Sequence, residues 1–405
     1  MAGQFTEQEW ATIENRLAQS GDVAFGLPAR DNETVLLASW NIRKFGSLLE
    51  QGQPNRSAGA WRLIERFCAR CDFLAIQEGQ DDLASVRHLR DRLNAVRPGA
   101  DYRIMASDLT GRAPGSSGLG ERFAFLFDHQ RVDSGEIASD LTFDQSEILK
   151  NINTAINEYR KQILDEQAGD SMAARALAWV QTFTGFYKDK LPAFFQFIRS
   201  PHLATFKIKG DAGHSYELAC VNAHLLSGRA IEREREFFAL LEWLLRRSGI
   251  NGQMDAPITI LLGDLNLDFK SDNDARRTAI EEYVVTINSQ QSRDAARVNF
   301  PFLDTPPGRE PIRSNSRENE TFDHIAWFSN DDRFPRGRHN GLAGHDGFDY
   351  GMFNFLKLFR EAGPGLLPNG KPAFGKFEHD VSDHMPIWVR LPVPSAGQKR
   401  YSVDG

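Results

Sequence analysis

Eight short apolar runs recur along the chain and are typical of buried strands, since they are rich in β-branched and aromatic residues. They cover Thr34–Trp40, Phe73–Ile76, Arg122–Phe127, Ala204–Ile208, Glu217–Val221, Ile258–Leu262, Phe322–Phe328 and Pro386–Leu391. Helical spacing of apolar residues lies between them at Ser57–Arg70, Asp81–Val96 and Arg229–Arg247. Strands and helices alternate at first, and strands then become more frequent. The pattern predicts an α/β fold with a mixed sheet, or two stacked sheets, covered by helices.

Segments outside this alternation suggest the domain organisation. We expect an N-terminal helical extension over residues 1–33, a central domain over 34–392 and a C-terminal tail over 393–405. Residues 136–195 are helical in pattern, and 330–380 are rich in Gly, Phe and Arg with little periodicity, so both are interpreted as insertions. The first insertion is expected to lie beside a substrate groove or to bind a regulatory partner or inhibitor, with a purely structural role as the alternative.

Composition limits the class of protein. The chain has 405 residues, of which 41% are hydrophobic and 25% charged, as in ordinary globular proteins. Glu7, Glu9 and Glu14 interrupt its start, which differs from a secretory signal, and no run is long enough to cross a bilayer. These features predict a cytoplasmic protein without a membrane partner. The net charge of −7 argues against nonspecific coating of nucleic acid but is compatible with a local basic groove.

The chain has three cysteines, which are too few for a disulfide framework at this length. Cys68 and Cys71 form a C-x-x-C pair at the end of the helix expected over Ser57–Arg70. No second Cys or His pair stands nearby to complete a zinc site. We therefore expect these two thiols to pack in the core rather than to carry metal or redox chemistry.

Polar side chains follow four of the apolar runs. Asn41 comes after the first run, Glu78 after the second, His224 after the fifth, and Asp264 with Asn266 after the sixth. Strands that end in this way place their terminal side chains along one edge of a sheet, where open α/β proteins bind their ligands. Four such strands together predict a functional site.

The types of side chain indicate the chemistry. Carboxylates and side-chain amides are ligands for Mg²⁺, Mn²⁺ or Ca²⁺ rather than for zinc. The candidates are Glu78, Asp264, Asp383, Asn41 and Asn266, and two histidines, His224 and His384, can exchange protons near neutral pH. Such a set suits attack on a phosphoester. The sequence has neither a G-x-x-x-x-G-K-[ST] loop nor a G-x-S-x-G elbow, which disfavours nucleotide-driven phosphoryl transfer and serine hydrolysis.

Seven ordered motifs carry a family resemblance. They are Ser39–Gly46 (SWNIRKFG), Ile76–Glu78 (IQE), Gly120–Phe127 (GERFAFLF), Asn222–His224 (NAH), Gly263–Asn266 (GDLN), Thr321–Ile325 (TFDHI) and Ser382–Pro386 (SDHMP). In this order they resemble the endonuclease/exonuclease/phosphatase superfamily. The resemblance implies a four-layered α/β sandwich of two packed mixed β-sheets flanked by helices, with a helical insertion, and makes residues 34–392 the catalytic domain.

The resemblance also implies roles for individual residues. Glu78 and Asn41 would hold a divalent cation, Mg²⁺ or alternatively Mn²⁺ or Ca²⁺, with Asp383 contributing. Asp264 and Asn266 would orient the attacked phosphate and the water. The catalytic histidines would each be positioned by a carboxylate, in the pairs His224 with Glu121 and His384 with Asp323. The general base, His224 or Asp264, is left open.

Within the superfamily the motifs are closest to deoxyribonuclease I. Arg199 and Arg43 match arginines with which that enzyme contacts DNA, so the resemblance implies a DNA endonuclease leaving 5′-phosphate and 3′-hydroxyl ends. Two groove-contacting side chains of that enzyme are replaced, at about Leu119 and Gln80. The alternatives are hydrolysis of a lipid or inositol phosphate on the same fold, and an inactive binding module. The complete set of acids, amides and histidines argues against the last.

Overall fold

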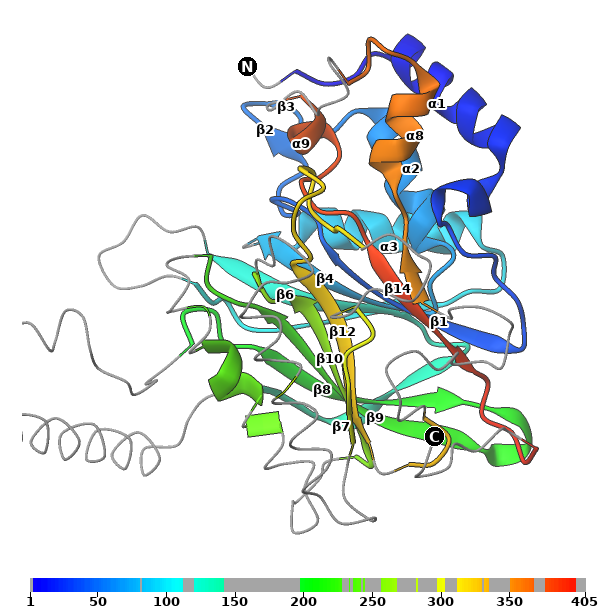
Figure 1. Ribbon diagram of the computed structural model, residues 1–405, viewed down its shortest axis with the longest axis vertical. Coiled ribbons are helices and arrows are strands. Elements are labelled where there is room, and N and C mark those ends of the chain that lie inside the picture. Colours follow the sequence, from blue (N-terminus) through cyan, green and yellow to red (C-terminus); the bar gives the residue numbers. More distant parts are fainter. Residues whose placement is uncertain are drawn as a thin grey trace, which may run out of the picture.

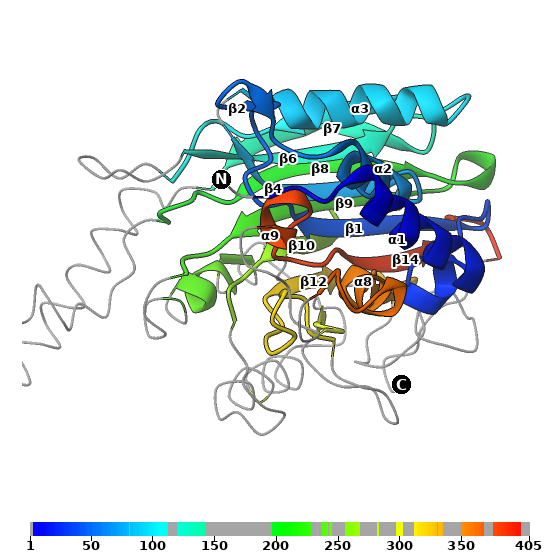
Figure 2. The same cartoon turned by 90° about the horizontal axis from the view of Figure 1, so that it is seen from above.

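Two β-sheets packed face to face form the centre of the protein (Figures 1 and 2). The computed structural model describes residues 3–80, 82–111, 120–141, 197–227, 233, 236–241, 243–244, 256–267, 282, 297–302, 312–329, 331–334, 350–367 and 376–397.

The first sheet has the strand order β13-β14-β1-β4-β6-β5. Its strands are β13 (Tyr350–Met352), β14 (Ile387–Pro392), β1 (Thr34–Asn41), β4 (Phe73–Gln80), β6 (Glu121–Asp128) and β5 (Tyr102–Ala106). β1 and β4 are parallel, whereas the other neighbours are antiparallel. The sheet is therefore mixed.

The second sheet repeats this plan in the order β11-β12-β10-β9-β8-β7. Its strands are β11 (Arg297–Asn299), β12 (Asp323–Ser329), β10 (Ile258–Asp264), β9 (Ser215–His224), β8 (His202–Lys209) and β7 (Val132–Asp140). Among the described strand pairs of this sheet, β9 and β10 are parallel and all the others are antiparallel. A separate small hairpin joins β2 (Leu49–Glu50) to β3 (Gln53–Pro54).

The alternating direction of side chains along each strand explains why apolar cores lie on both faces of the first sheet. In β1, Val35 and Leu37 face the second sheet and belong to the core between the sheets, while Leu36 and Trp40 belong to the core under the helices. Side chains of a strand point alternately to opposite faces, so a strand covered on both faces is apolar throughout. This is why the sequence shows continuous apolar runs here rather than alternating ones.

Helices cover the outer face of the first sheet (Figure 1). They are α1 (Glu7–Ser20), α2 (Ala58–Cys68), α3 (Ala84–Val96) and α8 (Phe355–Ala362), with the short helices η1 (Asp22–Phe25), η2 (Asp211–Gly213) and α9 (Phe377–Asp380) elsewhere in the described chain. Thr6 and Glu9 form a capping box at the start of α1, and the Ser57 hydroxyl caps α2. On the outer face of the second sheet, Phe237, Leu240 and their neighbours form a further apolar cluster.

The fold class predicted from the sequence is confirmed, because two mixed sheets are packed together and flanked by helices. All eight expected strands are present; three begin at the expected residue, and the other ends are shifted by one to four residues. β5, β7, β11 and β13 were not expected, since they are short or, as in β7, mostly exposed. Residues 142–196 of the first expected insertion, 335–349 and 368–375 of the second, and 398–405 of the tail lie outside the described residues.

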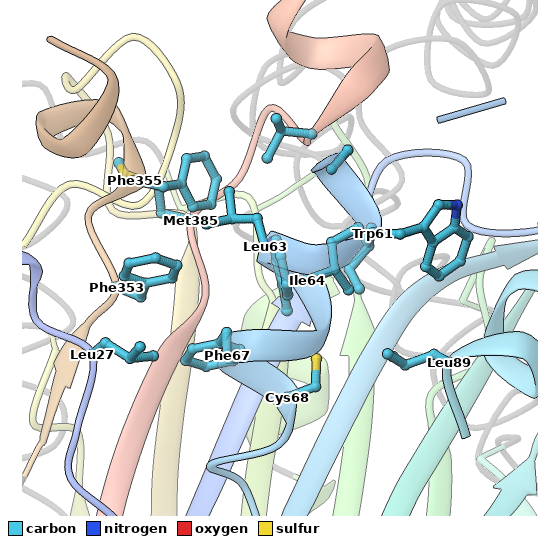
Figure 3. Close-up of a cluster of buried hydrophobic side chains, with 14 of the residues drawn as sticks. Leu27, Trp61, Leu63, Ile64, Phe67, Cys68, Leu89, Phe353, Phe355 and Met385 are labelled. Atoms are coloured by element: carbon cyan, nitrogen blue, oxygen red, sulfur yellow. The ribbon is translucent and has the colours of Figure 1, made fainter. Parts of the chain in front are cut away.

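The C-x-x-C pair is part of the apolar core, as expected. Cys68 and Cys71 are both free and buried, and Figure 3 shows Cys68 on α2 among Phe67, Ile64 and Leu89. Burial raises the pKa of both thiols, which keeps them protonated and unreactive. Among the described residues, no helix combines the length and the apolar character needed to span a bilayer.

Candidate active site

The topology brings the ends of several strands together at one edge of the sandwich. β9 and β10 run parallel and end side by side, which pairs His224 with Asp264 in register. β12 is antiparallel to β10, so its first residue, Asp323, lies opposite Asp264. In the facing sheet, Asn41 ends β1 and Glu121 begins the antiparallel β6. The polar strand ends noticed in the sequence therefore belong to one site.

Two carboxylate–imidazole pairs form the sides of this site. Nδ1 of His224 lies 2.9 Å from Oε2 of Glu121, and Nδ1 of His384 lies 2.8 Å from Oδ2 of Asp323. All four side chains are buried. A carboxylate at Nδ1 fixes the orientation of the ring and leaves Nε2 facing the site. The structure thus forms both pairs that the motifs imply.

Asp264 lies between the two rings. Its Oδ2 is 3.5 Å from Nε2 of His224 and 3.6 Å from Nε2 of His384, and it accepts a hydrogen bond of 2.9 Å from the Asn41 amide. The backbone N–H of Asn266 donates to the other oxygen at 2.9 Å. Although burial raises the pKa of Asp264, His384 and His224 lower it below its ordinary value. Asp264 is therefore ionised at neutral pH.

The two rings hold protons more tightly than a free histidine does. Burial lowers the pKa of His224, and so does Arg199, but the carboxylates of Glu121 and Asp264 raise it, and the net change is upward. Burial acts in the same direction on His384, where Asp323 and Asp264 together raise the pKa well above its ordinary value. The site therefore carries proton donors beside an ionised acid.

Glu78 reaches the site through an irregularity in β4. The pairing of β4 with β6 shifts register between Ile76 and Gly79, and Glu78 adopts a left-handed φ of +59°. Its carboxylate accepts a hydrogen bond of 2.9 Å from the backbone N–H of Lys44. Burial raises the pKa of Glu78, yet His224 and other neighbours lower it overall. A strained residue held by several contacts is a feature of functional sites.

Glu78, Asn41 and Asp383 have the chemistry of a hard-cation site. The Oδ1 atoms of Asn41 and Asp383 are both buried and have no hydrogen-bond partner among the residues that the structure describes. Glu78 contributes electrostatically to the raised pKa of Asp383, and burial is the largest cause of that rise. Two neighbouring acids and two unpaired oxygens fit a divalent cation. Within the described part of the chain, no three His, Cys, Asp or Glu side chains cluster as a metal site, so this set depends on the amide of Asn41.

The G-D-x-N motif has a steric explanation. Gly263 has a φ of +146°, and a Cβ atom there would collide with the carbonyl oxygen of Ala223 on β9. The close approach of the two strands lets Asp264 face His224. Asn266 follows with a φ of +50°, and its amide donates to the carbonyl of Leu225 at 2.8 Å. Asn266 thereby ties the loop after β10 to the loop after β9.

The two expected substrate arginines line the site but are already paired. Arg199 contacts Glu121 through Nε and donates from Nη1 to the Leu225 carbonyl at 3.2 Å. Arg43 donates from Nη1 to Glu378 at 2.6 Å and lies 3.6 Å from Asp383. A guanidinium has five N–H donors, so each retains donors for a phosphate. The motifs did not indicate these internal ion pairs.

A buried polar bridge under the site was missed from the sequence. Gln77 on β4 donates to Oδ1 of Asn222 on β9 at 2.6 Å, and the Asn222 amide donates to the carbonyls of Ile76 and Ala124 at 3.1 Å each. Asn222 thus satisfies carbonyls beside the irregular part of β4. The available signal was an amide directly after each of two apolar runs, Gln77 after Ile76 and Asn222 after Val221.

The chain was compared with families, curated proteins and solved structures. No family model and no curated protein matches it. Similar solved structures include the human Nocturnin catalytic domain with bound sulfate (TM-score 0.44, 13% identity, covering 89% of this chain and 95% of that one). ANGEL2, described as a 2′,3′-cyclic phosphatase, has a TM-score of 0.45 and 13% identity, covering 90% and 98%.

A further similar structure is an endonuclease/exonuclease/phosphatase family protein from Leptotrichia buccalis C-1013-b (TM-score 0.41, 12% identity, covering 88% of this chain and 98% of that one). The superfamily in this description is the one whose ordered motifs the sequence resembles. A particular closeness to deoxyribonuclease I is not among these findings. Since all three TM-scores are below 0.5, function is inferred from the side chains of the site.

Proposed function

We propose that the protein is a divalent-metal-dependent phosphodiesterase that cuts DNA internally and leaves 5′-phosphate and 3′-hydroxyl ends. The observation that carries this proposal is the convergence of two carboxylate-supported histidines on Asp264, with Nε2 atoms at 3.5 and 3.6 Å from one of its oxygens. Hydrolysis of a phosphodiester needs an acceptor for the proton of water and a donor for the leaving oxygen. Groups of both kinds face each other across this site.

In this proposal each step of phosphodiester hydrolysis is assigned to particular residues. Asp264 and His224 are the candidates for accepting the proton of the attacking water. His384, whose pKa is raised by Asp323 and Asp264 despite burial, is suited to donate a proton to the 3′-oxygen as the P–O bond breaks. Asn266 and the remaining donors of Arg199 hold the phosphate oxygens. Glu121 and Asp323 keep both rings in place.

The oxygens of Glu78, Asn41 and Asp383 would hold the cation, and Mg²⁺ or Mn²⁺ suits these ligands. When bound, the cation stabilises negative charge on the phosphate.

The surface favours a polyanion over a lipid. Among the described residues, the exposed large hydrophobic side chains are Val23, Leu49, Val96, Ile137 and Ile198, which lie on five different segments. Membrane-docking proteins expose contiguous apolar surface, whereas no two of these five side chains share a helix, strand or loop. Arg43 and Arg199 instead line the site with positive charge.

The proposal is tested by product analysis. Purified protein is incubated with supercoiled plasmid, single-stranded DNA, RNA, sphingomyelin and inositol phosphates in EDTA, Mg²⁺ or Mn²⁺. We expect nicked plasmid whose ends are substrates for ligase, only when metal is present. An untouched plasmid with hydrolysed lipid or inositol phosphate would instead establish the alternative substrate class.

A further inference from the structure

A cationic cavity lies next to the metal-binding residues but is not part of them. It has a volume of about 190 Å³ and is lined by Arg43, Lys44, Arg56, Glu50, Glu378 and His379, among others. It begins at the loop after β1, where the backbone N–H of Lys44 donates to Glu78. The cavity therefore opens where the candidate metal site ends.

Arg56 is the unusual residue of this cavity. Its side chain is only 2% exposed, yet it forms no ion pair with a carboxylate of the described residues. It donates to the backbone carbonyl of Arg43 and lies over the ring of Phe45 at 5.3 Å, while its Nε has no hydrogen-bond partner. Burial lowers its pKa to about 10. The carboxylates of Asp380, Glu78 and Asp383 act on Arg56 electrostatically but do not outweigh the cost of burying its charge, and an anion in the cavity would offset part of that cost.

The neighbouring charges add to this effect. Glu378, one of two acids in the lining, is already occupied by Arg43 at 2.6 Å and by the hydroxyl of Ser316 at 3.2 Å. Lys44 is exposed and, within the described chain, also has no carboxylate partner. Burial together with Arg43 and Lys44 lowers the pKa of His379, as expected where positive charge accumulates. Two cations thus remain available to a ligand.

We propose that this cavity binds a second phosphate group of the substrate, next to the one that is cut. The inference rests on the proposed function and adds a subsite to it. Arginine donors suit phosphate oxygens, and a lysine adds charge without fixing direction. The phosphate would be recognised without regard to base identity.

Kinetics with two substrates test the subsite. The variants are Lys44→Gln and Arg56→Gln, and the matched control is Lys207→Gln, which removes an exposed lysine from the far part of β8. We expect Lys44→Gln to raise KM for a short oligonucleotide at least tenfold more than KM for bis(p-nitrophenyl) phosphate, which has a single phosphate. Arg56→Gln should act in the same direction, provided that thermal melting shows that this variant is folded. If Arg56→Gln is not folded, the result for Lys44→Gln alone decides. The proposal is overturned if both substrates respond equally.

A binding measurement separates this proposal from the catalytic one. Anisotropy of a labelled oligonucleotide in EDTA, where no turnover is expected, should show about tenfold weaker binding for Lys44→Gln and wild-type binding for Lys207→Gln. Oligonucleotides with and without a 5′-phosphate show whether the cavity binds a terminal or an internal phosphate. Weaker binding of either oligonucleotide by Lys44→Gln supports the subsite. Equal affinity of the two lysine variants, or no binding by the wild-type protein, overturns it. Binding without hydrolysis would refute only the proposed activity.

Discussion

At the scale of single residues, the proposed function depends on carboxylates and imidazoles that are buried in pairs. Glu121 and His224 form such a pair at 2.9 Å, and Asp323 and His384 another at 2.8 Å. Burial alone would lower the pKa of both rings, and the partner carboxylates together with Asp264 reverse this effect. The family resemblance implied both pairs, and the structure brings the members of each pair together; Glu121, His224 and Asp323 stand at strand ends, whereas His384 lies in the chain before β14.

Removing the carboxylate beside His224 should change the pH dependence. In Glu121→Gln the raised pKa of His224 loses the charge that sustains it, so the pKa falls. Whichever limb of the pH–rate profile reports His224 should therefore move to lower pH. The measurement is kcat/KM on a chromogenic phosphodiester from pH 5 to about 9, in the range where histidines titrate. Glu217→Gln, at the other end of β9, is the control, and an unchanged profile in Glu121→Gln would contradict the assigned pair.

The metal prediction concerns Glu78. Glu78→Gln keeps the shape of the side chain but removes a full charge from a set with only two carboxylates, so Mn²⁺ affinity should fall at least about tenfold, or ~1.4 kcal/mol. Calorimetric titration of Mn²⁺ measures this directly and without substrate. Glu33→Gln, an exposed acid before β1, should bind Mn²⁺ like the wild type. Equal affinities in the two variants would place the metal elsewhere.

At the scale of elements, continuous apolar runs made the central strands predictable. β1, β4, β9 and β10 are covered on both faces, so their sequences differ clearly from those of loops. The edge strand β7 is exposed at most positions and leaves no comparable signal. The left-handed conformation of Glu78 was also beyond prediction, because it depends on the pairing of β4 with β6 rather than on local sequence.

The bridge between the sheets gives an element-scale prediction. Asn222→Ala removes the donor to the carbonyls of Ile76 and Ala124 and the acceptor of the 2.6 Å bond from Gln77, whose amide keeps only its 3.2 Å bond to Ser39. Buried polar groups without partners cost about 1–3 kcal/mol each, so the free energy of unfolding should fall by roughly 2–4 kcal/mol. Urea denaturation measures this, with the exposed Asn32→Ala as control. A loss below about 0.5 kcal/mol would show that the bridge does not hold the sheets together.

At the scale of the whole molecule, segments far apart in the sequence meet at the site. Asp380, three residues before Asp383 of the proposed metal site, accepts hydrogen bonds from the backbone of Phe5 at 2.9 Å and from Ser57 at 2.6 and 2.7 Å. The N-terminal segment and α2 are thereby tied to the chain just before β14, as Figure 1 shows for α1, α2 and α9. Ser57 follows Arg56, so these contacts also position the cationic cavity. No local sequence pattern predicts contacts over such separations.

The charge of the whole molecule opposes DNA binding, and the charge of the site favours it. With a net charge of −7, binding has to come from the cations gathered around the site, namely Arg43, Lys44, Arg56 and Arg199. Each phosphate contact contributes about −0.9 to the slope of log affinity against log salt for duplex DNA, so contacts by all four predict a slope of roughly −3 to −4. Anisotropy of a labelled duplex across a salt series measures the slope, and Lys44→Gln should reduce its magnitude by about one, whereas Lys207→Gln should not. A slope near zero would mean that the acidic surface prevails over the local charge, and that DNA is the wrong substrate.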